Sequence, residues 1–141
     1  MDGLLINTED IYTLSTTKLL AEYNKPPMNW DFKMQVMGLP GPEVFKKFIK
    51  YYDMEGKITY EEYAEKQHAY QEKAWIECDY LPGVKEFLTY LIEEKNIPCA
   101  ICTSSDDKKF QLKTIRNLKN DGLIEKFVHV IKGDDPRLAN G

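Results

Sequence analysis

Polar residues follow two apolar segments in the second half of the chain. Residues 97–102 (IPCAIC) lead into Thr-Ser-Ser at 103–105, and residues 127–131 (FVHVI) lead to Gly-Asp-Asp at 133–135. Hydroxyls and backbone N–H groups between a strand end and a helix N-terminus suit an anion such as phosphate. The alternative is that residues 103–105 only cap a helix beginning near Asp106, because Ser and Thr are common at helix starts. The sequence leaves both readings open at this point.

The two apolar segments are typical of parallel strands joined by a helix. Residues 97–102 form a continuous apolar run, as in a strand buried on both faces. A polar helix is expected over residues 106–120 and a second strand over residues 127–131. This order predicts a right-handed parallel crossover, with both carboxyl strand ends at the edge of the sheet where ligands bind. The predicted fold class is therefore α/β.

The first half of the chain is predicted to be helical. A helix begins at Thr8, which we expect to be its N-cap, and stops at Lys-Pro-Pro of residues 25–27. A short helix is expected over residues 30–37, and Pro42 suits the first turn of the next one. Thr-Tyr-Glu-Glu at 59–62 fits a capping box that opens a long helix. The chain thus places a helical portion ahead of its α/β portion.

Composition excludes several classes of protein. The 141 residues are 43% hydrophobic and carry a net charge of −4, so no basic excess indicates a nucleic acid or an anionic membrane as partner. No apolar run approaches the roughly 20 residues of a membrane span, and the first residues lack the pattern of a signal peptide. Three cysteines argue against a disulfide scaffold and favour a reducing compartment, the cytosol or also the nucleus.

Four segments together resemble the haloacid dehalogenase-like hydrolase superfamily. Residues 1–9 (MDGLLINTE) resemble its first motif from the second position onward, and residues 81–83 (LPG) resemble the return from cap to core. Residues 97–105 look like the second motif, and residues 133–141 like the loop before the third. Within the superfamily, the Gly-Asp-Asp-Pro and Thr-Ser-Ser segments look most like the pseudouridine-5′-phosphatase branch.

The resemblance implies a particular domain organisation. Residues 1–9 and 79–141 would form a Rossmann-like core, incomplete and with two recognisable strands. Residues 10–78 would form an all-helical cap inserted after the first motif. In such proteins a cap closes over the substrate and excludes water.

The resemblance also implies a reaction, the hydrolysis of a small phosphorylated metabolite such as a nucleoside or sugar monophosphate. A carboxylate attacks the phosphate and forms an aspartyl-phosphate, and a second Asp protonates the leaving oxygen and then activates water. Mg²⁺ neutralises the charge between phosphate and carboxylate. The chain would then be a Mg²⁺-dependent phosphomonoesterase.

Four residues take these roles by their positions in the motifs. Asp2 matches the general acid/base, and its backbone carbonyl matches a Mg²⁺ ligand. Thr103 matches the hydroxyl that holds the phosphoryl oxygens, with the amides of Asp2 and Ser104 beside it. Gly3 would let the backbone approach the ligand closely.

Other residues of the family's site are expected outside this sequence. The resemblance places the nucleophile immediately before Met1 and the third-motif lysine immediately after Gly141. The expectation is therefore that the chain is a fragment, truncated at both ends, and hydrolyses no phosphate ester by itself. One alternative is a catalytically dead pseudoenzyme or gene-fragment product, and another is a helical interaction module that binds a partner through the cap.

Two further groups of residues could carry chemistry. Cys99 and Cys102 have a C-x-x-C spacing, but strand positions three apart point to opposite faces, so we interpret both as buried core residues. Lys109, Lys113 and Arg116 lie on one face of the helix expected at 106–120. We interpret that face as solvated surface, with an acidic partner as the alternative.

Overall fold

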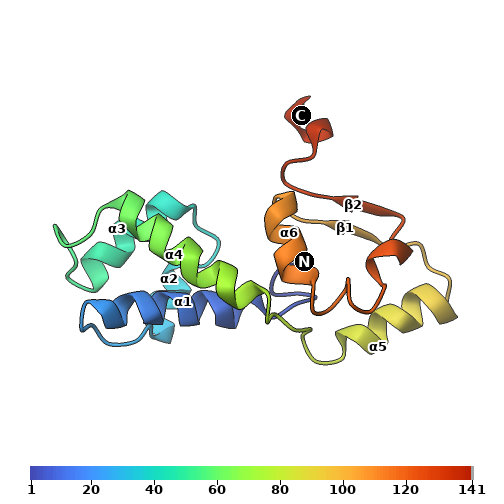
Figure 1. Ribbon diagram of the computed structural model, residues 1–141, viewed down its shortest axis with the longest axis horizontal. Coiled ribbons are helices and arrows are strands. Elements are labelled where there is room, and N and C mark those ends of the chain that lie inside the picture. The colour runs from blue at the N-terminus through green and yellow to red at the C-terminus, as the bar shows by residue number, and fades with distance from the viewer. Residues whose placement is uncertain (141) are drawn as a thin grey trace. The chain divides into compact units, whose positions relative to one another are not determined.

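The computed structural model describes the backbone of residues 1–140 and the side chains of residues 1–138, and it divides into two compact units (Figure 1). The α/β unit consists of Met1–Glu9 together with the chain from Glu72 onward, and the helical unit is Asp10–Gln71. The helical unit thus ends at residue 71, whereas the resemblance predicts a helical cap that ends at residue 78. Residue 141, the end of the expected third-motif loop, lies outside the described residues.

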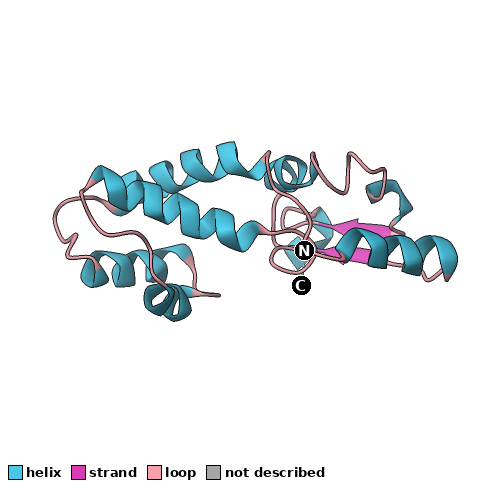
Figure 2. Ribbon diagram, turned by 90° about the horizontal axis from the view of Figure 1, so that it is seen from below, coloured by secondary structure: helices cyan, strands magenta, loops and turns pink. Residues whose placement is uncertain are grey.

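Four helices, drawn in cyan with the others in Figure 2, supply the helical unit. They are α1 (Thr8–Glu22), α2 (Trp30–Val36), α3 (Gly41–Tyr51) and α4 (Tyr60–Trp75), of which α1 begins and α4 ends in the α/β unit. All four helices predicted from the first half of the sequence are therefore confirmed. Their shared core is apolar and rich in aromatic rings, with Phe48 in edge or tilted contact with Phe32, Tyr52 and Tyr63.

Local hydrogen bonds fix where these helices start. The capping box is confirmed, because the Glu62 amide donates to Thr59 Oγ1 at 3.2 Å and the Thr59 amide donates to Glu62 Oε2 at 2.9 Å. Asn29 caps α2 by accepting from the Phe32 amide at 2.9 Å. Thr8 begins α1 as predicted, but its hydroxyl is buried and has no hydrogen-bond partner among the described residues. The expected N-cap role of Thr8 is therefore wrong.

The α/β unit contains the predicted parallel crossover. Helix α5 (Val84–Thr89) runs into a π-helical turn at Tyr90–Glu94, and β1 (Ala100–Cys102), α6 (Asp107–Thr114) and β2 (His129–Ile131) follow. Strands β1 and β2 pair in parallel, with Ile101 opposite Val130. Within the described residues these two strands form the whole sheet, drawn in magenta in Figure 2. The α/β class predicted from the sequence is confirmed.

Strand β1 is shorter and more exposed than expected. Ile101 is 3% exposed and packs against Leu88, Phe110 and Leu118, whereas Cys102 is exposed and Cys99 is half-buried. Successive strand residues point to opposite faces, and only the Ile101 face meets the core. The prediction that both cysteines are buried is therefore wrong.

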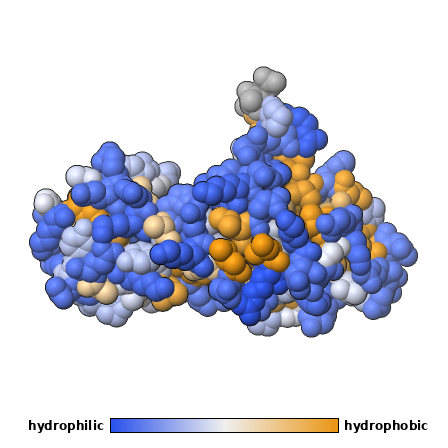
Figure 3. Space-filling model, viewed as in Figure 1, coloured by the Kyte–Doolittle hydropathy of each residue, from blue (hydrophilic) through white to orange (hydrophobic). Residues whose placement is uncertain are grey.

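Large apolar side chains also lie on the surface of the α/β unit. Leu4, Phe87 and Val128 each expose more than half of their area, and Figure 3 shows apolar surface on this unit in orange. In the part of the chain that the structure describes, no helix is both long enough and apolar enough to span a membrane.

Candidate functional site

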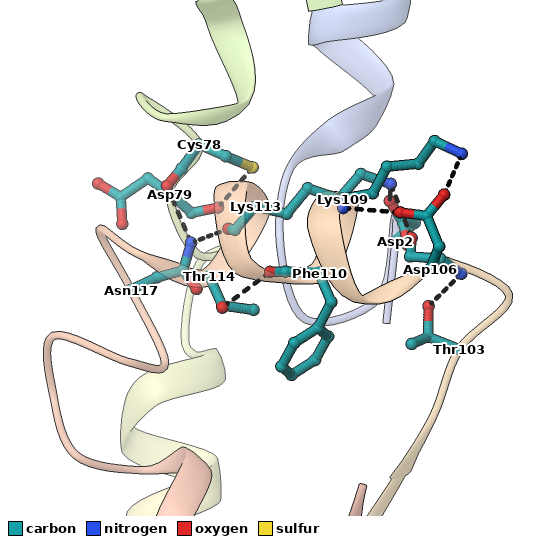
Figure 4. A network of polar contacts seen from close by, with 11 residues as sticks. Asp2, Cys78, Asp79, Thr103, Asp106, Lys109, Phe110, Lys113, Thr114 and Asn117 are labelled. Carbon is teal, nitrogen blue, oxygen red and sulfur yellow. Dashed lines mark hydrogen bonds and ion pairs between the residues drawn. The ribbon is translucent and has the colours of Figure 1, made fainter. Parts of the chain in front are cut away.

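Asp2, Ser105 and Lys113 meet at one point of the α/β unit. Lys113 Nζ lies 2.5 Å from Asp2 Oδ1 and 3.0 Å from Ser105 Oγ, and Ser105 Oγ lies 3.4 Å from Asp2 Oδ2. Three separate segments contribute these side chains: the N-terminal segment, the loop after β1, and α6. Figure 4 shows Asp2 at the end of the Lys113 side chain, and it shows Thr103 on the loop after β1.

A tight turn at the N-terminus presents Asp2. Gly3 has a φ of +63°, a left-handed conformation that side chains rarely adopt, and its amide donates to the Ile6 carbonyl at 3.0 Å. Ile6 is fully buried and bridges to Tyr80, which anchors the turn in the unit. The conformation of this turn therefore explains why glycine stands at position 3. The expected close approach of Gly3 to a ligand stays a prediction.

The loop after β1 continues the strand pairing and then bends. The Thr103 amide donates to the Ile131 carbonyl at 3.0 Å, and Thr103 Oγ1 accepts from the Ser105 amide at 3.2 Å. This turn directs the buried Ser105 hydroxyl toward Asp2 and leaves Ser104 exposed. Thr103 is thus linked to Asp2 through Ser105, and the hydroxyl that contacts the carboxylate is that of Ser105.

The loop after β2 packs tightly against the loop after β1. The Gly133 amide donates to the Ser105 carbonyl at 2.9 Å, and a Cβ atom at Gly133 would lie 2.2 Å from the Ser104 carbonyl oxygen. The carboxyl ends of the two strands therefore meet, as the parallel crossover predicts.

Two carboxylates, and not the hydroxyls of residues 103–105, cap α6. Asp106 Oδ1 accepts from the Lys109 amide at 2.8 Å, and Asp134 Oδ2 accepts from the Asp107 amide at 3.0 Å. Hydrogen bonds from the Lys109 side chain and amide lower the pKa of Asp106. The alternative reading of residues 103–105 as the helix cap is therefore wrong, because Asp106 has that role and leaves the hydroxyls available for other contacts.

Lys113 is not on a solvated surface, contrary to the sequence interpretation. The whole residue is 2% exposed, and its ammonium lies 4.9 Å from the ring centroid of the equally buried Trp75. Lys109 and Arg116 do extend to the surface, where they pair with Asp106 and Glu77. A buried cation is costly unless it is paired, and Asp2 supplies the opposite charge.

Sequence reasoning included Ser105 only as part of the loop at 103–105, without a role of its own, and it missed Lys113 as a member of the site. The sequence signal for Lys113 is weak, because it shares the buried face of α6 with one apolar residue, Phe110, and with the polar Thr114. Asn117 continues the polar network by donating to the carbonyls of Cys78 at 2.9 Å and Lys113 at 2.8 Å (Figure 4). Burial raises the pKa of the Cys78 thiol to about 11.

The described residues do not by themselves form a Mg²⁺ site. Among them, no group of three or more His, Cys, Asp or Glu side chains is placed to hold a metal ion. The Asp2 carboxylate already accepts a hydrogen bond from the Lys113 ammonium, which puts a positive charge beside it. Mg²⁺ prefers one or two carboxylates together with phosphate oxygens and water, so the residues described here are too few to fit it alone.

The arrangement suits the binding of an anion beside a carboxylate. The Ser105 hydroxyl and the Lys113 ammonium contact Asp2 at the carboxyl ends of parallel strands, and Thr103 is bonded to Ser105. Such strand ends, with helix N-termini and hydroxyls, are typical phosphate sites in α/β proteins.

Relatives with curated descriptions cover the whole chain. A Saccharomyces cerevisiae protein named "probable pseudouridine-5′-phosphatase" is 48% identical over 141 residues, which are 100% of this chain and 57% of that protein. The mitochondrial (DL)-glycerol-3-phosphatase 1 of Arabidopsis thaliana is 32% identical over 141 residues, 100% of this chain and 46% of that protein. The chain spans about half the length of these relatives.

A solved structure shares the fold, and a family model matches most of the chain. A haloacid dehalogenase-like family hydrolase of Streptococcus pneumoniae superposes with a TM-score of 0.69 at 20% identity, covering 96% of this chain and 59% of that one. The model of the family described as haloacid dehalogenase-like hydrolase matches residues 1–138. The four ordered segments, the parallel crossover with a helical unit, and this match lead to one conclusion: the chain belongs to the haloacid dehalogenase-like hydrolase family.

Proposed function

We propose that the α/β unit binds the phosphoryl group of a small phosphorylated metabolite and supplies the acid/base carboxylate for hydrolysis of its monoester. The contact between Asp2 and Ser105, which are 103 positions apart in sequence, carries this proposal. It brings the first-motif carboxylate and a second-motif hydroxyl to the strand ends. The names of the relatives, "probable pseudouridine-5′-phosphatase" and (DL)-glycerol-3-phosphatase 1, support a small phosphorylated substrate.

The proposed roles belong to groups of the N-terminal turn and of the loop after β1. Asp2 gives a proton to the leaving oxygen and then takes one from water, which requires a carboxylate held beside the phosphoryl group. The Thr103 hydroxyl and the amides of Asp2 and Ser104 hold the phosphoryl oxygens. Gly3 keeps the first-motif backbone in the left-handed turn that presents Asp2.

Mg²⁺ enters the proposal only through the resemblance. The backbone carbonyl of Asp2 would be one of its ligands, and the metal would supply charge neutralisation at the phosphate. The side chains described here do not complete its coordination, so no step of the proposal runs through the metal.

We expect the 141-residue chain to bind phosphate without turning over phosphate esters. Formation of an aspartyl-phosphate needs a nucleophilic carboxylate in addition to the acid/base. The carboxylates of Asp106 and Asp134, which flank the loops at the strand ends, are both held by amides of α6. Asp2 itself is held by Lys113.

The test is an amide chemical-shift titration of the ¹⁵N-labelled chain with pseudouridine 5′-phosphate, glycerol 3-phosphate and inorganic phosphate, each with and without Mg²⁺. We expect shifts at Ser104, Ser105 and Gly133 with each phosphorylated compound, and none with pseudouridine or glycerol. Shifts of equal size with the unphosphorylated compounds, or no shifts at these amides, would disprove the proposed phosphoryl site.

Release of phosphate from the same esters is measured in parallel. We expect no release of phosphate above that of a blank without protein. Turnover that depends on Mg²⁺ and disappears in Asp2→Asn would show that the chain is active, and only the expectation of no turnover would then be wrong.

A further inference from the structure

The ammonium of Lys113 is enclosed by the α/β unit and points at Asp2. The Lys113 side chain is 3% exposed, whereas the Asp2 side chain is 26% exposed, so the carboxylate forms the open end of the pair. Ser105 Oγ lies 3.0 Å from the ammonium on one side, and the Trp75 ring centroid lies 4.9 Å away on another. These contacts leave Lys113 little freedom to turn elsewhere.

The two oxygens of the Asp2 carboxylate have different surroundings. Oδ1 accepts from Lys113 at 2.5 Å, while Oδ2 has a long contact of 3.4 Å with Ser105 Oγ. One oxygen is therefore fixed, and the other is loosely held on the side of the second-motif loop. In the proposed acid/base role, Oδ1 would orient the group and Oδ2 would exchange the proton.

We propose that Lys113 is a positioning residue that fixes the Asp2 side chain and offsets negative charge beside it, so that an anionic phosphoryl group can bind there. This inference rests on the proposed phosphoryl site and adds to it a residue outside the matched motif positions. Without the ammonium, two anions at close range in a partly buried site would repel each other. Lys113 is not itself a ligand of the phosphoryl group in this arrangement, because its ammonium is enclosed behind Asp2.

The first test needs no ligand and follows the side-chain ammonium of Lys113 by ¹H–¹⁵N spectroscopy at fixed pH. Enclosed, hydrogen-bonded ammonium groups exchange slowly with water, so we expect a resolved signal that is lost in Lys113→Met. In Asp2→Asn the signal should shift and broaden. Lys119→Met is the matched control, because Lys119 is exposed and bonds Gln111, and it should leave the signal unchanged. An ammonium signal that is the same in Asp2→Asn and in the unchanged protein would overturn the inference.

The second test measures the affinity for inorganic phosphate in four variants. Lys113→Met should weaken binding by at least about tenfold, because the Asp2 charge is no longer compensated. Lys113→Arg keeps the charge and should recover part of the loss. The double variant Asp2→Asn with Lys113→Met removes both charges and should restore binding to near that of Asp2→Asn alone. A double variant as weak as Lys113→Met would mean that Lys113 binds phosphate directly, and the positioning role would be wrong.

The two tests separate this inference from the proposed function. If the unchanged protein binds no phosphate, the proposed function fails, and the ammonium signal still decides whether Lys113 holds Asp2. If phosphate binds but the Lys113 ammonium signal is the same in Asp2→Asn as in the unchanged protein, the phosphoryl site stands and the inference fails.

Discussion

Gly133 and Ser104 are in such close contact that no side chain fits between them. A Cβ atom at Gly133 would lie 2.2 Å from the Ser104 carbonyl oxygen and 2.8 Å from the carbonyl carbon. Both atoms belong to backbone, so neither can rotate away. This contact joins the loops that follow β1 and β2.

Gly133→Ala should therefore force the two loops apart. We expect a loss of about 1–3 kcal/mol of unfolding free energy, in the range of other overpacked sites, measured by urea denaturation. The Ser105 amide should shift strongly, because the carbonyl of the same residue accepts from the Gly133 amide. Gly122→Ala is the control, because Gly122 has a φ of +64° but open space around it, so it tests backbone strain without the clash. Equal Ser105 shifts in both variants would contradict the steric explanation.

Removal of the capping box should destabilise the start of α4. Thr59→Ala deletes the hydroxyl that accepts from the Glu62 amide, and we expect a cost of about 1 kcal/mol. The measurement is amide hydrogen exchange in the first turn of α4, which should become faster. Glu65→Gln, at an exposed position beyond the first turn, should leave that exchange unchanged. Protection that survives Thr59→Ala would mean that helix packing, and not the cap, holds this turn.

Glu22 should make the helical unit sensitive to acid. Hydrogen bonds from Lys66 and then Tyr70 lower its pKa below the usual 4.5. A carboxyl whose pKa is lower in the folded state stabilises that state above its unfolded value, and this contribution is lost as the pH falls through the folded value. Urea midpoints at pH 7, 5, 4 and 3 should therefore fall more steeply for the unchanged protein than for Glu22→Gln. Glu65→Gln, which changes an exposed carboxyl, should follow the unchanged protein. Parallel curves for all three proteins would contradict the prediction.

The three thiols should react in an order set by exposure. Cys102 is exposed and Cys99 half-buried, while Cys78 is buried and its pKa is raised to about 11, so little thiolate forms there near pH 8. Mass spectrometry after brief iodoacetamide treatment should find Cys102 modified first and Cys78 unmodified until the protein is unfolded in urea. Cys102→Ser should remove the fast phase. Early modification of Cys78 in the folded protein would contradict its burial.

Much of the fold follows from local sequence signals. The capping box at Thr59 and Glu62, the proline-punctuated helices and the two apolar strands all have short-range causes, and the structure contains each of them. The element ends depend on details that periodicity does not contain. Pro98 has no N–H to donate to a strand ladder, which accounts for β1 beginning at Ala100. Helix α6 ends at Thr114 because the Asn117 side chain competes for backbone hydrogen bonds there. It donates to the Lys113 carbonyl and accepts from the Leu118 amide.

The candidate site was predicted only in part because its key contact is long-range. Asp2 and the second-motif loop were identified from motif position, and the structure brings Asp2 to Ser105 and not directly to Thr103. Lys113 was misread because a lysine on a polar helix is usually solvated. Its burial becomes intelligible only once Asp2, from the other end of the chain, is present as its counter-charge.

The burial of Trp75 beneath the Lys113 ammonium has an optical consequence. Trp75 is 2% exposed, whereas Trp30, in the helical unit, is 63% exposed. An indole shielded from water emits at shorter wavelength than one in contact with it, so the two units carry fluorophores of different colour. On excitation of tryptophan alone, a shift of the Trp75 emission to longer wavelength would then report the opening of the α/β unit, against a Trp30 signal that already comes from an exposed indole.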